Sequence, residues 1–187
     1  MRLVLASASP RRRALLCEAR IECEVAPPEV EEDLSCAEAG ATATELAVAL
    51  ALRKALDRAR CEPGEARVLG ADTLVVPECG APFGKPRDLD EARRMLYALA
   101  GREHRVVTGI ALVETSTGAA RTRVVESFVR LRAPGPELES YLRTGLPLGK
   151  AGAYGVQDPG SPVLEVRGSL TNVIGLPMEE VLELLSA

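Results

Sequence analysis

The order of short apolar runs constrains the fold of this chain more than any other feature of its sequence. Leu3–Ala6 is typical of a buried strand, and helical sequence follows at once from Pro10 to Ala19. Val68–Val76 and Val106–Val113 are also apolar, whereas Val125–Arg132 alternates between apolar and charged residues, as a strand with one solvent-facing side does. Helices separate some strands, while other strands follow one another directly. The pattern therefore predicts an α/β fold with a mixed rather than a purely parallel sheet.

Further elements follow from local signals. Ile21–Val25 predicts a second strand, and Thr42 with Glu45 has the spacing of a capping box that opens a long helix. Proline at the first helical position predicts a short helix over Pro136–Arg143 and a C-terminal helix that begins at Pro177. The long helix should direct one face toward the core, and that face comprises Val48, Leu52, Ala55, Leu56 and Ala59.

Length and composition limit the class of protein. The chain has 187 residues, of which 47% are hydrophobic, and no repeat or linker divides it, so we expect a single domain over residues 1–187. The net charge is −4 and acids are interspersed with arginines, which argues against binding to nucleic acid. No apolar run reaches membrane-spanning length, and the N-terminal basic cluster follows apolar residues instead of preceding them, unlike a signal peptide. We therefore expect a cytoplasmic protein without a membrane partner.

The cysteines and the histidine exclude several kinds of site. The chain has 5 cysteines and no Cys-x-x-Cys pair, which argues against a disulfide framework or a zinc site and fits a reducing cytosol. The chain contains 1 histidine, His104, so we expect neither a histidine-based metal site nor a Ser-His-Asp triad.

The segment Ser7–Arg13, with the sequence SASPRRR, joins a strand to a helix start. Ser9 is the expected N-cap residue, so free backbone N–H groups and the helix dipole attract an anion there. The hydroxyls of Ser7 and Ser9 and the side chains of Arg11 and Arg12 would complete a cradle for a phosphate. The alternative is an ordinary capped helix with solvated arginines, although consecutive arginines at a helix N-terminus oppose the dipole unless an anion compensates them.

Two groups of carboxylates are candidates for holding a metal ion. Glu31, Glu32 and Asp33 lie in an acidic loop, whereas Asp72 stands between apolar neighbours in the sequence GADT. Burial of such an acid costs free energy unless it binds something. Carboxylates together with waters are the usual means of holding Mg²⁺ against substrate phosphates. The alternatives are a solvated face for the loop acids and a turn or capping role for Asp72.

The lysines lie at selected places in a chain whose other basic residues are mostly arginines. Lys85 and Lys150 each lie in a glycine-rich loop, and Lys54 lies on the long helix. This distribution favours a role for the loop lysines as compact point charges. Neither loop is a P-loop, because each has one residue fewer between its glycines than the Walker motif and no Ser or Thr after the Lys. Lys150 lies within Gly145–Pro162, a long loop without periodicity, and such loops are usually functional.

The chain resembles the Maf family of nucleotide pyrophosphatases through an ordered set of segments: SASPRRR, GADT, GKPRD, GKAGAYGVQ and TNVIGLP. Each motif alone is weak, but the ordered set is specific and extends over essentially the whole chain. The family is similar to the inosine-triphosphate pyrophosphatase fold. The resemblance therefore implies a long twisted mixed sheet flanked by helices, two lobes around a cleft, and a homodimer.

The resemblance also assigns roles to positions in this sequence. It places the catalytic residues at Glu32, Lys54, Asp72 and Lys85. It places substrate-binding residues at Ser7, Arg11, Arg12, Thr73 and Gln157, with Ser9 beside them at the helix start. The implied reaction is attack of water on the α-phosphorus of a nucleoside triphosphate, which releases pyrophosphate. Glu32 and Asp72 would hold a divalent metal ion (Mg²⁺, or Mn²⁺ or Co²⁺), and the alternative is that Asp72 takes the proton of the water directly.

The loop that ends at Gln157 bears on the choice of substrate. Family members with the sequence KAGAYGxQ resemble the branch that prefers dTTP and UTP, with Arg11, Thr73 and Gln157 linked to base choice. Asp158 follows where the family usually has Gly, which affects the base pocket and leaves CTP or modified pyrimidine nucleotides as further candidate substrates. Leu170 stands where Tyr is common, a change that affects packing.

Two other functions stay open at this point. The same cradle could sense a nucleotide without hydrolysing it, as a regulator of septum formation and cell division, with which the family has been associated. A purine-directed pyrophosphatase, including one that prefers 7-methyl-GTP, is the second alternative. The carboxylates and lysines favour a house-cleaning hydrolase, because binding alone needs no base, and Gln157 argues against a purine.

Overall fold

The computed structural model describes residues 1–29 and 40–186. The strands are β1 (Arg2–Ala6), β2 (Glu24–Val25), β3 (Ala66–Val76), β4 (Glu103–Glu114), β5 (Ala120–Leu131) and β6 (Val163–Arg167). The helices are α1 (Pro10–Glu18), α2 (Ala43–Arg60), α3 (Leu89–Leu99), α4 (Pro136–Arg143), α5 (Leu170–Ile174) and α6 (Met178–Ser186), with a 3₁₀ turn η2 (Ala151–Ala153). Within the described ranges, no helix combines the length and apolar character that crossing a membrane requires.

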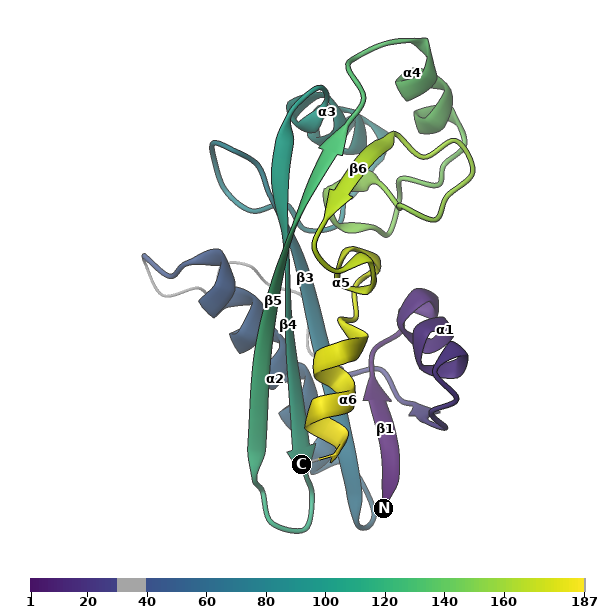
Figure 1. The fold of residues 1–187 in the computed structure, drawn as a ribbon. Coiled ribbons are helices and arrows are strands. Elements are labelled where there is room, and N and C mark those ends of the chain that lie inside the picture. The colour runs from purple at the N-terminus through teal and green to yellow at the C-terminus, as the bar shows by residue number, and fades with distance from the viewer. Residues whose placement is uncertain (30–39, 187) are drawn as a thin grey trace. The chain divides into compact units, whose positions relative to one another are not determined.

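The strands form a 6-stranded sheet in the order β2-β1-β3-β4-β5-β6 (Figure 1). β1 runs parallel to β2 and to β3, whereas β6 pairs antiparallel with β5. The predicted α/β class, with a mixed sheet flanked by helices, is therefore confirmed. The predicted strand Ile21–Val25 is wrong in extent, because the Ile21 N–H closes the C-terminus of α1 by donating to the Leu16 carbonyl at 2.9 Å.

The chain divides into two compact units. Unit 1 comprises Met1–Asp72, Thr108–Val125 and Gly175–Ala187, and unit 2 comprises Thr73–Val107 and Glu126–Ile174. The strands β3, β4 and β5 each contribute residues to both units. The two units correspond to the two lobes that the family resemblance implies, and the cleft stays a prediction.

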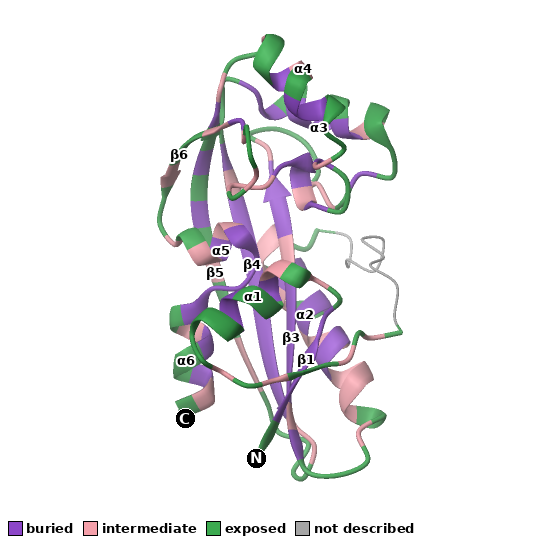
Figure 2. Cartoon of the chain, turned by 90° about the vertical axis from the view of Figure 1, so that its right-hand side faces the viewer, coloured by how far each residue is buried: buried purple, intermediate pink, exposed green. Residues whose placement is uncertain are grey.

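In unit 1, the backbone of α2 lies directly against the sheet. β3 and β4 are buried along most of their length (Figure 2). A Cβ atom on Gly70 would lie 2.3 Å from the carbonyl oxygen of Ala51, and one on Gly109 would lie 2.3 Å from that of Ala47. Because no side chain fits at either glycine, these positions of β3 and β4 set how closely the helix approaches.

The buried face of α2 differs from the predicted one. Its fully buried residues are Leu46, Ala47, Leu50, Ala51, Lys54 and Ala55. Of the predicted face, Ala55 is buried, whereas Val48, Leu52, Leu56 and Ala59 are only half-buried. The prediction is right in part, because Leu52, Leu56 and Ala59 pack against the core cluster of unit 1. The fully buried contact with the sheet is made by the alanines, where the two glycines leave room.

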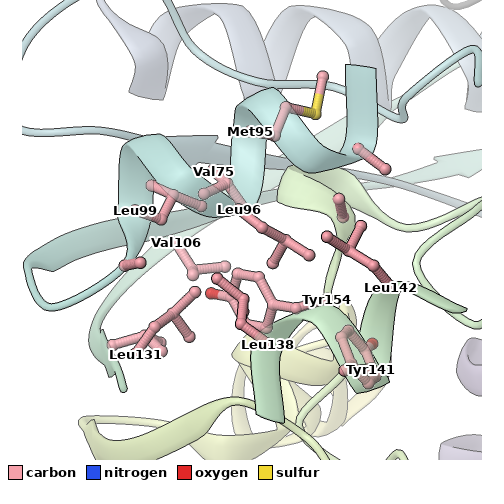
Figure 3. Packing of buried hydrophobic residues seen from close by; sticks show 14 residues of the cluster. Val75, Met95, Leu96, Leu99, Val106, Leu131, Leu138, Tyr141, Leu142 and Tyr154 are labelled. Carbon is pink, nitrogen blue, oxygen red and sulfur yellow. The ribbon is translucent and has the colours of Figure 1, made fainter. Parts of the chain in front are cut away.

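In unit 2, helices α3 and α4 enclose a second apolar core (Figure 3). α4 spans Pro136–Arg143, as the sequence predicts. The buried core cluster includes Val75, Leu96, Leu99, Val106, Leu131, Leu138, Tyr141, Leu142 and Tyr154. Burying a large apolar side chain contributes roughly 1.5–3 kcal/mol relative to exposing it, so this cluster stabilises the part of the chain that carries the long glycine-rich loop.

His104 belongs to this second core. Its Nε2 lies 2.7 Å from the Tyr154 hydroxyl, and the two rings meet edge to face with centroids 5.5 Å apart. Burial lowers the pKa of His104 to about 4, so the ring is neutral at pH 7. Burial also raises the pKa of Tyr154, which keeps the hydroxyl protonated. His104 is therefore a packed core residue.

Candidate active site

The first part of the candidate site is the junction between β1 and α1. Ser9 is the N-cap residue of α1, as predicted, but its side chain makes no capping hydrogen bond. The hydroxyl of Ser7 instead accepts a hydrogen bond from the Ser9 backbone N–H at 3.2 Å. Ser7 is buried, and Ser9 and Arg11 are half-buried at the helix start. The predicted strand-to-helix junction is confirmed, with Ser7 rather than Ser9 supplying the hydroxyl that receives a backbone N–H.

Arg12 is buried in unit 1 and connects three segments of it. Its Nη1 donates to the hydroxyl of Ser7 at 3.0 Å and to the carbonyl of Ala71 at 2.9 Å. Its Nε donates to the carbonyl of Gly175 at 2.8 Å. Hydrogen bonds from a charged donor contribute about 1.5–3 kcal/mol each, so this guanidinium holds α1, β3 and the Gly175 segment together. The sequence did not reveal this connecting role, and the contact of Arg12 with a phosphate stays a prediction.

The second part of the site is a buried ion pair between α2 and β3. Lys54 Nζ lies 2.6 Å from Asp72 Oδ1, and the two side chains are 4% and 8% exposed. A buried carboxylate without a partner costs several kcal/mol, so Lys54 is what allows Asp72 to lie among apolar neighbours. Because Asp72 lies inside β3, its alternative role in a turn or cap is wrong. The structure therefore brings together two residues predicted to be catalytic.

These two parts of the site meet at β3. β1 and β3 run parallel with Ala6 paired to Gly70, which brings the residues that follow these two positions side by side. Because Arg12 donates to the carbonyl of Ala71, its guanidinium lies one residue along the strand from Asp72. Unit 1 thus groups a hydroxyl, a guanidinium, an ammonium and a carboxylate. Donors of this kind stabilise phosphate oxygens, and a carboxylate beside them can act as a base or bind a metal ion.

The predicted metal ligands are Asp72 and Glu32. Glu32 lies outside the described residues, as do Glu31 and Asp33. Across residues 1–29 and 40–186, no three His, Cys, Asp or Glu side chains form a group that could hold a metal ion. The carboxylate of Asp72 is an oxygen ligand of the type that hard divalent cations prefer, so its chemistry fits Mg²⁺.

Unit 2 contains the other predicted site residues, which are Thr73, Lys85 and Gln157. Thr73 lies in β3 and is half-buried. The loop that leads to Lys85 is joined to β3 by two backbone hydrogen bonds between Val75 and Phe83, of 2.7 and 3.2 Å. Lys85 itself is exposed just beyond this pairing.

The loop that carries Gln157 lies beside the loop that carries Lys85. The Gly152 N–H donates to the Gly84 carbonyl at 3.1 Å. Gly152 has a φ of +65°, and a Cβ atom there would lie 2.9 Å from the side chain of Val75, so the position requires glycine. Gln157 is exposed, which leaves its amide accessible to a ligand. The structure therefore brings the Lys85 and Gln157 loops together within unit 2.

Sequence reasoning missed one buried ion pair in this region. The sequence predicts Lys150 only as a point charge of a glycine-rich loop, and Asp158 only as a departure from the family pattern. Lys150 Nζ lies 2.6 Å from Asp158 Oδ2, and the side chains are 8% and 13% exposed. An irregular loop separates the two residues, so no periodicity or spacing rule could have predicted their contact.

The fold and these buried groups define an α/β protein with charged side chains gathered at the junction of two parallel strands. Over residues 2–187 the chain matches the family model described as Maf-like protein, and it therefore belongs to the Maf family. The resemblance drawn from the sequence motifs is thereby confirmed.

Proteins with similar sequences support the same family. A dTTP/UTP pyrophosphatase from Anaeromyxobacter sp. (strain Fw109-5) is 45% identical over 189 residues, which cover 98% of this chain and 88% of that protein. Another from Geotalea uraniireducens (strain Rf4) is 44% identical, with coverage of 98% and 93%. A third, from Symbiobacterium thermophilum, is 42% identical, with coverage of 98% and 92%. The chain is thus similar to these proteins over nearly their whole length.

Proposed function

We propose that this chain is a nucleoside triphosphate pyrophosphatase that hydrolyses dTTP and UTP to the monophosphate and pyrophosphate. Relatives of 42–45% identity that carry the name dTTP/UTP pyrophosphatase support this proposal. The structural observation that carries it is the buried pair of Lys54 and Asp72, one residue along β3 from the carbonyl that Arg12 binds. A protein that only senses nucleotides would not need a buried acid at this place.

In the proposed reaction, a water oxygen bonds to the α-phosphorus while the bond from that phosphorus to the bridging oxygen breaks. Asp72 accepts the proton of the water, and Lys54 stays beside the carboxylate. Pyrophosphate leaves with the electron pair of the broken bond. Arg12, Lys54 and Lys85 neutralise the charge that develops on the phosphate oxygens. Asp72 and Glu32 would hold a divalent cation, Mg²⁺ or else Mn²⁺ or Co²⁺, which would supply Lewis-acid stabilisation of negative charge during hydrolysis.

The choice of base is assigned chiefly to Gln157, in unit 2. The amide of Gln157 both donates and accepts hydrogen bonds, which suits the imide edge of thymine and uracil. Arg11 and Thr73 would act with it, as the family resemblance implies. We also propose a cytoplasmic homodimer whose partner is the nucleotide substrate rather than nucleic acid or a membrane, which agrees with the net charge of −4.

The test is to incubate the purified protein with dTTP, UTP, CTP, GTP and 7-methyl-GTP in the presence of Mg²⁺ or Mn²⁺, and to separate the products. We expect monophosphate and pyrophosphate, formed fastest from dTTP and UTP. Orthophosphate as the first product would mean attack at the γ-phosphorus and would contradict the proposed mechanism. A preference for GTP or 7-methyl-GTP would favour the purine-directed alternative.

Asp72→Asn is the variant that tests the chemistry, because it removes charge and basicity with little change in volume. Because it leaves the Lys54 ammonium unpaired, it should also lower stability by about 3–5 kcal/mol, and it should abolish turnover at temperatures where far-UV circular dichroism still shows a folded protein. Asp90→Asn is a suitable control, since the side chain of Asp90 is 88% exposed on α3. Near-wild-type turnover by the Asp72 variant would show that this residue is neither base nor metal ligand.

A further inference from the structure

A buried polar cluster in unit 2 is centred on Asp158. Its Oδ2 atom accepts a hydrogen bond from the Tyr141 hydroxyl at 2.5 Å and lies 2.6 Å from Lys150 Nζ. Tyr141 is 2% exposed and packs into the core of unit 2 (Figure 3). Lys150 also donates to the carbonyl of Leu146. We call Tyr141, Lys150 and Asp158 the Asp158 cluster. A largely buried carboxylate, with its side chain 13% exposed, is thus paired with both a charged and a neutral donor.

The cluster closes the loop that lies between Lys150 and Asp158. The Gly155 N–H donates to the Tyr141 hydroxyl oxygen at 3.0 Å, and the Asp158 N–H donates to the Gly155 carbonyl at 3.2 Å. A Cβ atom on Gly155 would lie 2.7 Å from Asp158 Oδ2, so the backbone at the middle of the loop touches the carboxylate. Residues 151–157 therefore form a loop whose two ends are joined by an ion pair.

Gln157 directly precedes the central acid of this cluster and is exposed. At the other side of the loop, Gly152 donates to the carbonyl of Gly84, the residue before Lys85. A displacement of Asp158 would therefore shift its neighbour Gln157 directly. Through the rest of the loop, it would also disturb the hydrogen bond between Gly152 and the Lys85 loop. Both loops carry residues that the proposed function assigns to the substrate.

We propose that Asp158, held by Lys150 and Tyr141, is a positioning residue that orients Gln157 and thereby sets the choice of nucleotide. This inference rests on the proposed function, because it needs Gln157 to contact the base. The physical reason is pre-organisation. If the loop is already fixed before binding, the nucleotide does not have to order it, and a misplacement of about 1 Å at a recognising group is enough to weaken binding severely.

The competing explanation is that the cluster only stabilises unit 2. The two explanations differ in what they predict for catalysis. A purely stabilising pair would lower the melting temperature without altering how the folded enzyme discriminates between nucleotides. A positioning group changes KM and discrimination more than kcat, because it acts on the residue that contacts the base and not on the acid that activates water.

The test variant is Asp158→Asn, which keeps the volume and an acceptor for Tyr141 but removes the charge that pairs with Lys150. A second variant, Tyr141→Phe, removes one hydroxyl and leaves the ion pair in place. Glu139→Gln is a matched control. Glu139 lies on the same helix as Tyr141 and likewise accepts from a cation, Arg93 at 3.0 Å, and from a tyrosine hydroxyl, Tyr97 at 2.7 Å. The side chain of Glu139 is 31% exposed, and these two partners lie on α3 and not in either loop.

Three measurements are made on each variant: kcat and KM for dTTP, UTP and CTP, calorimetric affinity for the α,β-imido analogue of dUTP, and hydrogen exchange of the amides of residues 151–157. Asp158→Asn should raise KM for dTTP about tenfold with kcat within about twofold, and lower the preference for dTTP over CTP by a similar factor. The analogue should bind about tenfold more weakly, and the loop amides should exchange faster. Tyr141→Phe should show the same changes to a smaller extent, and Glu139→Gln none of them.

The proposal is overturned if Asp158→Asn and Tyr141→Phe keep the KM values and the dTTP preference of wild type, or if Glu139→Gln changes them equally. Unchanged exchange of the loop amides overturns it as well. If wild type neither binds nor hydrolyses any nucleotide, the proposed function fails. The exchange comparison then still decides whether Asp158 fixes the loop.

Discussion

The ion pair between Lys54 and Asp72 makes a quantitative prediction about stability. Lys54→Met keeps most of the volume and removes the ammonium 2.6 Å from the carboxylate, which is 8% exposed. Removing one partner of a buried pair costs about 3–5 kcal/mol, because the other charge is left uncompensated. For a chain of this size each kcal/mol shifts the melting temperature by roughly 2–4 °C, so we expect a decrease of about 6–20 °C.

A second substitution distinguishes the interaction from the packing of the lysine stem. The double variant Lys54→Met/Asp72→Asn no longer contains a buried unpaired charge, so it should recover more than half of the free energy of unfolding that the single variant loses. Arg87→Met, which breaks an exposed pair with Glu91, is the control and should unfold like wild type.

The assay is urea unfolding followed by far-UV circular dichroism, because the chain contains no tryptophan whose fluorescence could report on unfolding. Two results would refute the reasoning. One is a loss in Lys54→Met below about 1 kcal/mol, the range of surface pairs. The other is strict additivity in the double variant, which would mean that the two charges do not interact.

Three further outcomes are expected. Excess EDTA should stop hydrolysis and added Mg²⁺ or Mn²⁺ should restore it, whereas full activity in the chelator would exclude a metal ion from the reaction. Gln157→Ala should lower the preference in kcat/KM for dTTP and UTP over CTP by about ten- to a hundredfold, since unpaired polar groups cost about 1–3 kcal/mol each. An equal loss of kcat/KM on every nucleotide would exclude Gln157 as the residue that recognises the base. Below pH 6.5 the unfolded chain protonates His104, whereas the folded protein, in which burial lowers the pKa of His104 to about 4, does not. The free energy of unfolding should therefore fall by up to about 3 kcal/mol as the pH is lowered from 6.5 to 4. Urea titrations at several pH values should show that His104→Gln removes this decrease. An unchanged dependence of the unfolding free energy on pH in the variant would refute the prediction.

The elements that the sequence predicted well are those fixed by local chemistry. Thr42 and Glu45 form the predicted capping box, and α2 begins at Ala43. Proline at the first helical position fixed the start of α4 in the same way. Such signals involve residues within one turn of each other, so no knowledge of the tertiary structure is needed to recognise them.

What the sequence did not reveal depends on contacts between distant segments. The sequence predicts only part of the core-facing side of α2: Leu52 and Leu56 do pack against the core, but the less hydrophobic alanines make the most deeply buried contact with the sheet. No local sequence signal indicates that Gly70 and Gly109 are the positions of the sheet against which the alanines of α2 pack. The sequence places Lys54 and Asp72 in the same candidate site but does not predict that they form an ion pair. That contact depends on how a helix and a strand pack together.

The boundary between the two units has a consequence for how such a protein diversifies. The chain crosses this boundary several times, and within β3 the crossing falls between Asp72 and Thr73. Of the described residues proposed to act in hydrolysis, Lys54 and Asp72 are in unit 1 and Lys85 is in unit 2, whereas Thr73 and Gln157, which are proposed to act on the base, are both in unit 2. On the proposed assignments, substitutions around Thr73 and Gln157 would alter which nucleotide is accepted without replacing Lys54 or Asp72, so that one fold could supply a series of enzymes that share a reaction and differ in substrate.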